Sequence, residues 1–221
     1  MWDIKLKPGQ SIYFTSDTHY SHKNICRGVS EWRTAEGKVP VEQTRDFPTL
    51  DKMNAAIVNN INSRVGQEDI LVHLGDWSFG GFDSIQEFRN RLVCNNVYLL
   101  YGNHDHHIER NRGSVQTMFT ATAQYKLLKV STVQSKTYEF ILTHYPICSW
   151  HDMSKGRMHL FGHVHLPSGK NVMKGRSMDV GMDSNSLTPY SLQEVVNLLE
   201  NRPKVVNSLP QDHHEKDLKV K

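Results

Sequence analysis

Short apolar runs alternate with amphipathic stretches along the first half of the chain. Three of these runs have the length and composition of buried strands, and each stops at a polar cluster: 12–15, 70–74 and 97–101. Between them, apolar residues recur at helical spacing over 50–61 and again over 85–92, where Asp83 and Gln86 resemble a capping box. The alternation of strands with helices predicts βαβ units and a parallel core sheet.

The second half of the chain is richer in strand signals. Its apolar segments, separated by polar turns, are 123–130, 136–143, 160–161, a short piece around Val172, and 178–182. Ser191 and Glu194 have capping-box spacing ahead of a last amphipathic helix, which Pro203 ends. These signals predict a second, more antiparallel sheet. The expected fold class is therefore α/β, with two mixed β-sheets packed as a sandwich and helices on the outer faces.

No repeat, low-complexity tract or linker interrupts this pattern. We expect a single domain over residues 1–203, in which the polar segment 20–48 is an excursion that could form a cap. Residues 204–221 are expected to be a charged, flexible tail. At 221 residues and 38% hydrophobic content, the chain can bury a core without disulfides.

Composition and charge exclude several classes of protein. Three well-separated cysteines make neither a disulfide framework nor a thiolate zinc finger. No apolar run approaches the ~20 residues of a membrane span, and the first ten residues lack the core of a signal peptide, so we expect a cytoplasmic protein with no membrane partner. The formal charge is +3, but residues 202–221 hold five Lys or Arg against three Asp or Glu, which leaves +1 elsewhere. No basic stripe supports a nucleic-acid partner.

Histidine is the unusual component, with 13 residues against 3 cysteines. Because an imidazole is costly to bury and titrates near neutrality, this surplus needs an explanation. Several histidines lie in polar clusters just past the predicted strands: 17–19, 75–76, 102–105, 144 and 162–165. Ligands of open α/β sheets bind beyond the carboxyl ends of the strands. The five clusters could therefore converge on one site.

Together the clusters offer seven donor groups to a metal: Asp17, His19, Asp76, Asn103, His144, His163 and His165. Carboxylate, imidazole and amide donors without a thiolate suit Mn, Fe, Zn or Ni, and the sequence does not choose among these metals. An open catalytic site uses three or four protein ligands per ion, so seven donors fit two divalent ions that share a bridging carboxylate. Because two adjacent cations favour in-line displacement at phosphorus, the residues predict a dinuclear hydrolase of a phosphate ester.

The ordered series D-x-H, G-D, G-N-H-D, H and G-H-x-H resembles the calcineurin-like metallophosphoesterase superfamily over residues ~11–183. It is most similar to the small single-domain phosphoesterases of bacteria and phages, whose opening motif continues as at 21–25 here. The resemblance implies the four-layer α-β-β-α metallophosphoesterase fold. It also implies a hydroxide between two ions that attacks phosphorus, with His104 beside the leaving group as general acid or as a stabiliser of charge.

The resemblance further divides the proposed ligands between two ions. It implies a first metal on Asp17, His19 and His165, a second on Asn103, His144 and His163, and a bridging Asp76.

At two places the sequence lacks residues that characterise other groups of this superfamily, which narrows the kind of phosphoesterase expected. Phosphoprotein phosphatases extend the second motif to G-D-x-V-D-R-G, and residues 75–80 here supply neither the acid nor the arginine. This argues against a protein phosphatase and leaves Asp105 as a local candidate to orient His104. Purple acid phosphatases carry a tyrosine three residues after the bridging aspartate. Phe79 at that position argues against a tyrosinate–iron site.

The expected enzyme is a dinuclear metal-dependent phosphoesterase, with a phosphodiester of a nucleotide or another small molecule favoured as substrate. His22, Lys23 and Arg27 follow the first motif and are candidates to bind the substrate. Two alternatives stay open. One is a nuclease acting on DNA or RNA, which needs a basic track; the other is a binding scaffold of this fold that has lost catalysis. The oligomeric state is also open.

Not every histidine is expected to belong to the site. His73 lies inside a predicted strand and is expected to be a buried, hydrogen-bonded side chain. His151 and His159 are expected to be ordinary residues outside the site, and His213 and His214 belong to the tail.

Overall fold

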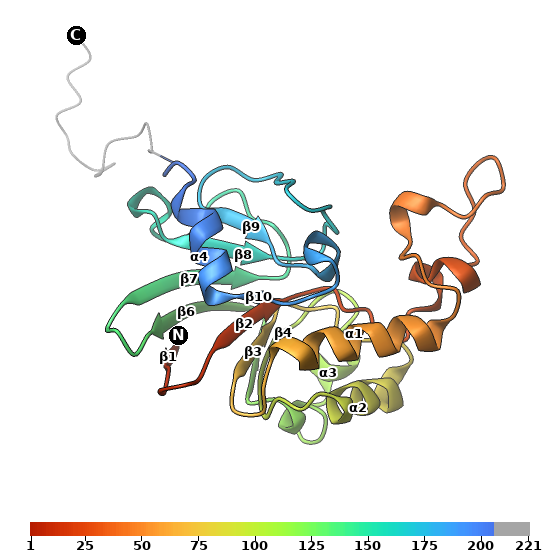
Figure 1. The fold of residues 1–221 in the computed structure, drawn as a ribbon, viewed down its shortest axis with the longest axis horizontal. Coiled ribbons are helices and arrows are strands. Elements are labelled where there is room, and N and C mark those ends of the chain that lie inside the picture. The colour runs from red at the N-terminus through yellow and green to blue at the C-terminus, as the bar shows by residue number, and fades with distance from the viewer. Residues whose placement is uncertain (206–221) are drawn as a thin grey trace, which may run out of the picture.

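The structure, a computed structural model that describes residues 1–205, is built around two five-stranded β-sheets (Figure 1). The first, called here the β3 sheet, has the strand order β10-β2-β3-β4-β5. Its strands are β2 (Ile12–Thr15), β3 (Ile70–His73), β4 (Asn96–Leu100), β5 (Ala121–Ala123) and β10 (Tyr190–Ser191). Strands β2 to β5 run parallel, and β10 lies antiparallel to β2. The predicted parallel core sheet is confirmed.

The second sheet, called here the β7 sheet, has the order β1-β6-β7-β8-β9. Its strands are β1 (Trp2–Lys5), β6 (Tyr125–Ser131), β7 (Thr137–Thr143), β8 (Met158–Phe161) and β9 (Ser177–Asp179). Strands β6 and β7 are antiparallel, whereas β1, β8 and β9 pair in parallel with their neighbours. Both sheets are therefore mixed, as the fold-class prediction required.

A hydrophobic core fills the space between the sheets. Phe14 of β2 and Phe140 of β7 meet there with their ring centroids 5.4 Å apart. Along β3, Ile70 and Val72 belong to this core, whereas Leu71 faces the opposite side of the sheet and packs with the helices. A strand that is buried on both faces must be apolar throughout, which explains the continuous run that marked β3 in the sequence.

Three helices cover the outer face of the β3 sheet: α1 (Leu50–Arg64), α2 (Gly81–Arg91) and α3 (His106–Arg110) (Figure 1). Helix α1 begins where predicted, because the Thr49 side chain accepts a hydrogen bond from the N–H of Lys52. The last helix, α4 (Leu192–Glu200), packs its apolar face into the core beside β10. The predicted capping box at Ser191 and Glu194 is present. Within residues 1–205, no helix is both long and apolar enough to cross a membrane.

Two local predictions were wrong. The N-cap of α2 is Gly80 with φ 99°, and within the described chain no side chain caps this helix, so Asp83 and Gln86 do not form a capping box. The chain around Val172 is irregular, and that side chain is 58% exposed, because it follows a tight turn rather than pairing with a strand. Strands β1, β5 and β10 were not predicted. Residues 206–221, which include His213, His214 and most of the predicted tail, lie outside the described residues.

His159 on β8 is outside the two donor groups, as expected, and it is fully buried. Its Nδ1–H donates to the carbonyl of Ile141 at 3.0 Å, and its Nε2 accepts from the N–H of Ile147 at 3.4 Å. The Trp150 ring packs against it, with the two centroids 5.0 Å apart. The neutral ring is thus fully hydrogen-bonded, and a proton on it would have no partner.

This burial predicts an acid-sensitive contribution to stability. Burial lowers the pKa of His159 from 6.5 to about 4, so the unfolded chain takes up a proton at a higher pH than the folded chain. The stabilisation is present at neutral pH and is lost as the pH falls from about 6.5 to about 4, by up to about 3 kcal/mol. Urea unfolding between about pH 7 and about pH 4.5 should show a steeper fall in the free energy of unfolding for wild type than for His159→Gln. Parallel pH curves for the two proteins would contradict this.

Candidate metal centre

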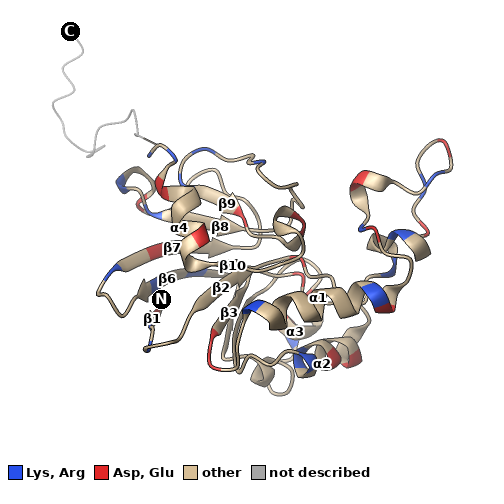
Figure 2. Cartoon of the chain, in the orientation of Figure 1, with Lys and Arg blue, Asp and Glu red and all other residues tan. Residues whose placement is uncertain are grey.

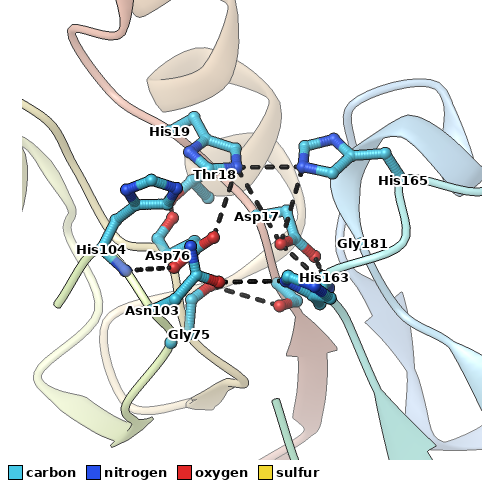
Figure 3. Close-up of polar contacts among 12 residues, drawn as sticks. Asp17, Thr18, His19, Gly75, Asp76, Asn103, His104, His163, His165 and Gly181 are labelled. Atoms are coloured by element: carbon cyan, nitrogen blue, oxygen red, sulfur yellow. Dashed lines mark hydrogen bonds and ion pairs between the residues drawn. The ribbon is translucent and has the colours of Figure 1, made fainter. Parts of the chain in front are cut away.

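The carboxyl ends of six strands meet at one end of the sandwich. Strands β2, β3 and β4 are parallel neighbours in one sheet, and β7, β8 and β9 are parallel neighbours in the other. The two sheets are joined there, because the N–H of Met182 donates to the carbonyl of Ser16 at 3.0 Å. The loops that follow these strands carry all seven predicted donors, and Figure 3 shows several of them pointing toward a common centre.

The backbone at this end is unusually strained. Five of the predicted donors have a positive φ: Asp17 (54°), His19 (48°), Asp76 (59°), His163 (72°) and His165 (47°). A left-handed conformation costs a residue with a Cβ roughly 1–2 kcal/mol, and such strain concentrates at functional sites. Backbone hydrogen bonds hold two of these turns: the N–H of Asp17 donates to Gly75, and that of His19 donates to Asp76. The strand ends therefore turn sharply to aim their side chains inward.

The first group of donor atoms comes from Asp17, His19 and His165. The Nε2 atoms of the two histidines lie 3.0 Å apart, and their rings stack with a centroid separation of 4.9 Å. Asp17 Oδ1 is 4.0 Å from His19 Nε2 and 3.8 Å from His165 Nε2. One carboxylate oxygen and two imidazole nitrogens thus face a single point.

The second group comes from Asp76, His144 and His163, with Asn103 beside it. Asn103 Oδ1 lies 3.1 Å from His144 Nε2 and 3.0 Å from His163 Nδ1. Gly102 leaves room for this group, since a Cβ there would come within 2.5 Å of the Asp76 backbone nitrogen. The structure brings the three imidazole and amide donors together with the Asp76 carboxylate.

Asp76 stands between the two groups (Figure 3). Its Oδ2 is 3.6 Å from His19 Nε2 in the first group and 3.5 Å from His144 Nε2 in the second. Its Oδ1 accepts a hydrogen bond from the backbone N–H of His104 at 2.9 Å, which fixes the carboxylate. One oxygen therefore faces both groups.

Hydrogen bonding indicates which nitrogen of two histidines is free to bind a cation. The Nδ1 of His144 lies 2.8 Å from the carbonyl of Leu74, which can only accept, so this nitrogen carries a proton. The Nδ1 of His165 likewise donates to the Asp183 carboxylate at 2.7 Å. In the neutral rings both Nε2 atoms then have a lone pair. For His144 that lone pair faces two further acceptors, on Asn103 and Asp76, an arrangement that a cation would stabilise.

Burial and the neighbouring imidazoles and carboxylates together shift the pKa values in the centre. Complete burial raises the pKa of Asp17 to about 7, although His165 and His144 act in the opposite direction. Burial also lowers the pKa of His19 well below its usual value, so this ring is neutral. Burial would raise the pKa of Asp76 too, but the neighbouring imidazoles of His144 and His19 prevail and lower it. The residues fit two divalent cations, which would compensate the buried carboxylates.

A family model described as calcineurin-like phosphoesterase matches residues 11–167. The chain belongs to the calcineurin-like phosphoesterase family. The matched segment contains the loops after β2, β3, β4 and β7 and the first residues after β8, including His163 and His165, so the resemblance carried by the ordered motifs is confirmed. The two Asp/His groups of this chain are suited to hold divalent metals. Their donor types do not determine which metals these are.

The chain is similar to other proteins over most of its length. An uncharacterized protein of Methanocaldococcus jannaschii is 25% identical over 206 residues, which cover 90% of this chain and 97% of that protein. The Gene 66 protein of Mycobacterium phage D29 is 24% identical over 213 residues, covering 86% and 98% of the two chains. A solved structure, a protein of unknown function from Aquifex aeolicus, matches with a TM-score of 0.57 at 21% identity and covers 86% of this chain and all of that one. The last likeness supports the fold alone.

Asp183 and Arg45 also belong to this centre, and sequence analysis missed both. Asp183 accepts from His165 Nδ1 and from Arg45 Nε, at 2.7 and 2.8 Å. Arg45, which is buried, also donates to the carbonyls of Asp17 and Thr18 at 2.6 and 2.7 Å. Burial would raise the pKa of Asp183, but Arg45 and His165 hold it far below its usual value. A carboxylate behind a metal-binding imidazole fixes both the proton and the ring orientation.

Asp183→Asn is therefore expected to weaken metal binding at the Asp17–His19–His165 group by about 10- to 100-fold, because a neutral amide no longer fixes the His165 proton. Competition against a chelator, followed by the stoichiometry of bound metal, measures this without any activity assay. Asp83→Asn makes the same change at an exposed position on α2 and should leave metal affinity unaltered. Equal affinity in Asp183→Asn and wild type would show that Asp183 does not support this metal.

His104 lies at the edge of the centre with an exposed side chain. Its ring centroid is 4.6 Å from that of Phe79 and 5.6 Å from that of His19. Asp105, the local candidate to orient this ring, instead uses its buried carboxylate to accept from the backbone N–H groups of Asp76, Trp77 and Gly102. Burial raises the pKa of Asp105 to about 6, against the effect of these bonds. The contacts of Asp105 hold the loops after β3 and β4 together.

A cavity of about 590 Å³ opens beside the metal centre. Of the three residues predicted to bind the substrate, one lines this cavity and two do not. His22 lines it. Lys23 pairs with Glu31 at 2.5 Å, and Arg27 pairs with Asp46 at 3.1 Å and donates to Thr44, so neither lines the cavity that the described residues form. The cavity is large enough for a small ligand well beyond a phosphate group.

Proposed function

We propose that the protein is a dinuclear metal-dependent phosphoesterase that hydrolyses small phosphodiesters, with His104 as the acid beside the leaving group. The observation that supports this most directly is the position of Asp76 Oδ2, 3.6 Å from a donor of one group and 3.5 Å from a donor of the other. A shared carboxylate is what two adjacent ions need. The proposed ligands are Asp17, His19 and His165 for one ion, Asn103, His144 and His163 for the other, and Asp76 for both.

Two bound divalent ions would supply an activated water for attack on phosphorus and would stabilise the charge on its oxygens. The chain's own residues have separate tasks. Asp183 keeps the proton of His165 on Nδ1, and the Leu74 carbonyl does the same for His144, so that both Nε2 atoms would be free to bind an ion. We assign to His104, whose ring contacts Phe79, the role of giving a proton to the departing oxygen.

The charges around the cavity favour a diester over a monoester dianion. Of the lining residues in the described chain, Arg45 is the one arginine or lysine, and its guanidinium is taken up by Asp183 and two carbonyls. Glu42 adds a carboxylate to the lining. A singly charged diester needs less positive charge than a monoester dianion. For the same reason a long polyanion finds little support: Figure 2 shows Lys and Arg scattered over the described chain rather than gathered in a stripe.

A substrate panel on metal-reconstituted protein tests the proposal. It compares p-nitrophenyl phosphate, bis-p-nitrophenyl phosphate, cyclic nucleotides, and DNA and RNA oligomers, each with Mn²⁺, Zn²⁺, Fe²⁺ or Ni²⁺. We expect hydrolysis that requires metal, saturates at two equivalents and is faster for small diesters than for monoesters. Faster turnover of oligomers would instead indicate a nuclease. Binding of two equivalents without hydrolysis of any ester would indicate a binding scaffold.

A further inference from the structure

A run of aromatic rings leads from the 20–48 excursion to the metal centre. Trp32 and His22 meet edge to face, with their centroids 5.7 Å apart. His22 lies 3.7 Å from Phe79, and Phe79 lies 4.6 Å from His104. All four rings line the same cavity. One wall of the cavity is thus aromatic from its outer rim to the proposed acid.

Trp32 stands out among the four tryptophans of the chain. Trp2, Trp77 and Trp150 are buried, whereas Trp32 is 37% exposed and faces the cavity. Its backbone is nonetheless held: its N–H donates to Ser30 Oγ, and Arg33 Nη1 donates to its carbonyl at 2.7 Å. A large exposed ring on a positioned backbone, at the rim of a cavity, offers a flat apolar surface to a ligand.

The rest of the cavity argues for a ligand with a substantial uncharged part. A volume of about 590 Å³ exceeds what a phosphate group fills, and the proposed metal donors make up only part of its lining. Trp32, Glu42 and Gln43 are exposed residues of the lining, and among the described residues the lining holds no lysine or arginine besides Arg45, so this part of the cavity would not attract a second phosphate. A planar aromatic group with polar edges matches both the rings and the two polar side chains.

We infer that Trp32, His22 and Phe79 form a subsite that stacks a planar aromatic ring of the phosphate ester, such as a nucleobase. This inference rests on the proposed function, because it places the phosphate at the metal donors. It goes further in naming a substrate class, since esters that carry a planar ring are selected over aliphatic ones. Stacking between a base and an aromatic side chain tolerates many ring types, so the subsite selects for a ring rather than for one base.

The test measures binding of phosphomonoesters that share the phosphate and differ only in the attached group. Methyl phosphate, ribose 5-phosphate, phenyl phosphate and adenosine 5′-phosphate are titrated calorimetrically into the metal-loaded protein. Wild type should bind phenyl phosphate and adenosine 5′-phosphate about tenfold more tightly than the ring-free compounds. Comparing the affinities for phenyl phosphate and adenosine 5′-phosphate shows whether any aromatic ring is sufficient or whether a nucleobase binds more tightly.

Variants assign the preference to the rings. Trp32→Ala should remove most of the preference and leave the affinity for methyl phosphate unchanged, whereas Trp32→Phe should keep it. Quenching of tryptophan fluorescence by adenosine 5′-phosphate should disappear in Trp32→Phe, which distinguishes stacking on this ring from a change in folding. Phe82→Ala, at an exposed aromatic residue on α2 outside the cavity, is the matched control.

Equal affinities for methyl and phenyl phosphate in wild type would overturn the inference. An equal loss of affinity for methyl phosphate and phenyl phosphate in Trp32→Ala would also overturn it. These titrations need no turnover. Selective ring binding without hydrolysis would therefore contradict the proposed function but not the aromatic subsite. Hydrolysis without a preference for ring-bearing esters would contradict the aromatic subsite but not the proposed function.

Discussion

Asp76→Asn should reduce turnover of a phosphodiester on the order of 10³-fold or more and lower the metal content below two equivalents. The substitution keeps the shape of the side chain but removes its charge and one of its oxygens. Because Oδ2 faces both donor groups, losing the carboxylate weakens both sides of the centre at once. Turnover of bis-p-nitrophenyl phosphate and the metal content after dialysis are the two measurements.

Asp69→Asn provides a matched control for this change. Asp69 precedes β3 at the opposite end from Asp76, and its carboxylate accepts from the N–H groups of Ser11 and Gly66. This variant should retain two ions and nearly full turnover, even where its stability falls. If Asp76→Asn also kept two ions and its activity, Asp76 would not be the bridging ligand.

His104→Ala should lower kcat by about 10²- to 10⁴-fold while both ions remain bound. Its ring is outside the two donor groups, and the bond to Asp76 comes from its backbone N–H, which alanine retains. An acid matters most when the leaving oxygen is strongly basic. The loss should therefore be much larger for a diester with an alkyl leaving group than for one with p-nitrophenolate, and comparing the two substrates measures this difference.

The neighbouring His106→Ala is the control, since His106 is exposed on α3 and outside the cavity lining. It should leave the kcat of both substrates close to that of wild type. An equal loss for the two leaving groups in His104→Ala would argue that His104 positions the substrate and does not act as an acid. Loss of metal in that variant would contradict its place in the mechanism altogether.

The convergence of the donor groups could be predicted because parallel strands place their carboxyl ends together. The apolar runs that became β2, β3 and β4 each ended at a donor, and parallel pairing alone brings Asp17, Asp76 and Asn103 to one edge. The other sheet adds His144 and the loop after β8 in the same way. Strong periodicity and an ordered series of motifs were sufficient for this part.

The partners of Asp183 and Arg45 could not be predicted from local sequence. These two residues are 138 positions apart, and neither lies in a periodic segment or a motif. Their pairing depends on how the excursion folds back over the loop after β2, which is a tertiary property. The same limitation applies to β5 and β10, whose few residues carry too little pattern to be distinguished from loop.

Charge was a poor guide to substrate contacts for a related reason. Lys23 and Arg27 lie just after a metal motif, but acids of the same excursion, Glu31 and Asp46, neutralise them. Sequence proximity to a motif says nothing about the direction of a side chain in an irregular segment. The aromatic residues of that segment, Trp32 and His22, face the cavity instead.

The excursion has a further consequence, for how the protein could change its preference for substrates. Its two ends are tied together beside the centre, because Cys26 and Arg45 form a β-bridge and the N–H of Arg45 donates to the carbonyl of Ile25 at 2.7 Å. Residues 27–44 thus form a closed loop on a fixed base (Figure 1). Lengthening or replacing such a loop costs little closure entropy. Provided that Arg45 is kept, we expect an exchange of this segment to alter the cavity that Trp32 lines and to leave the two Asp/His groups in place.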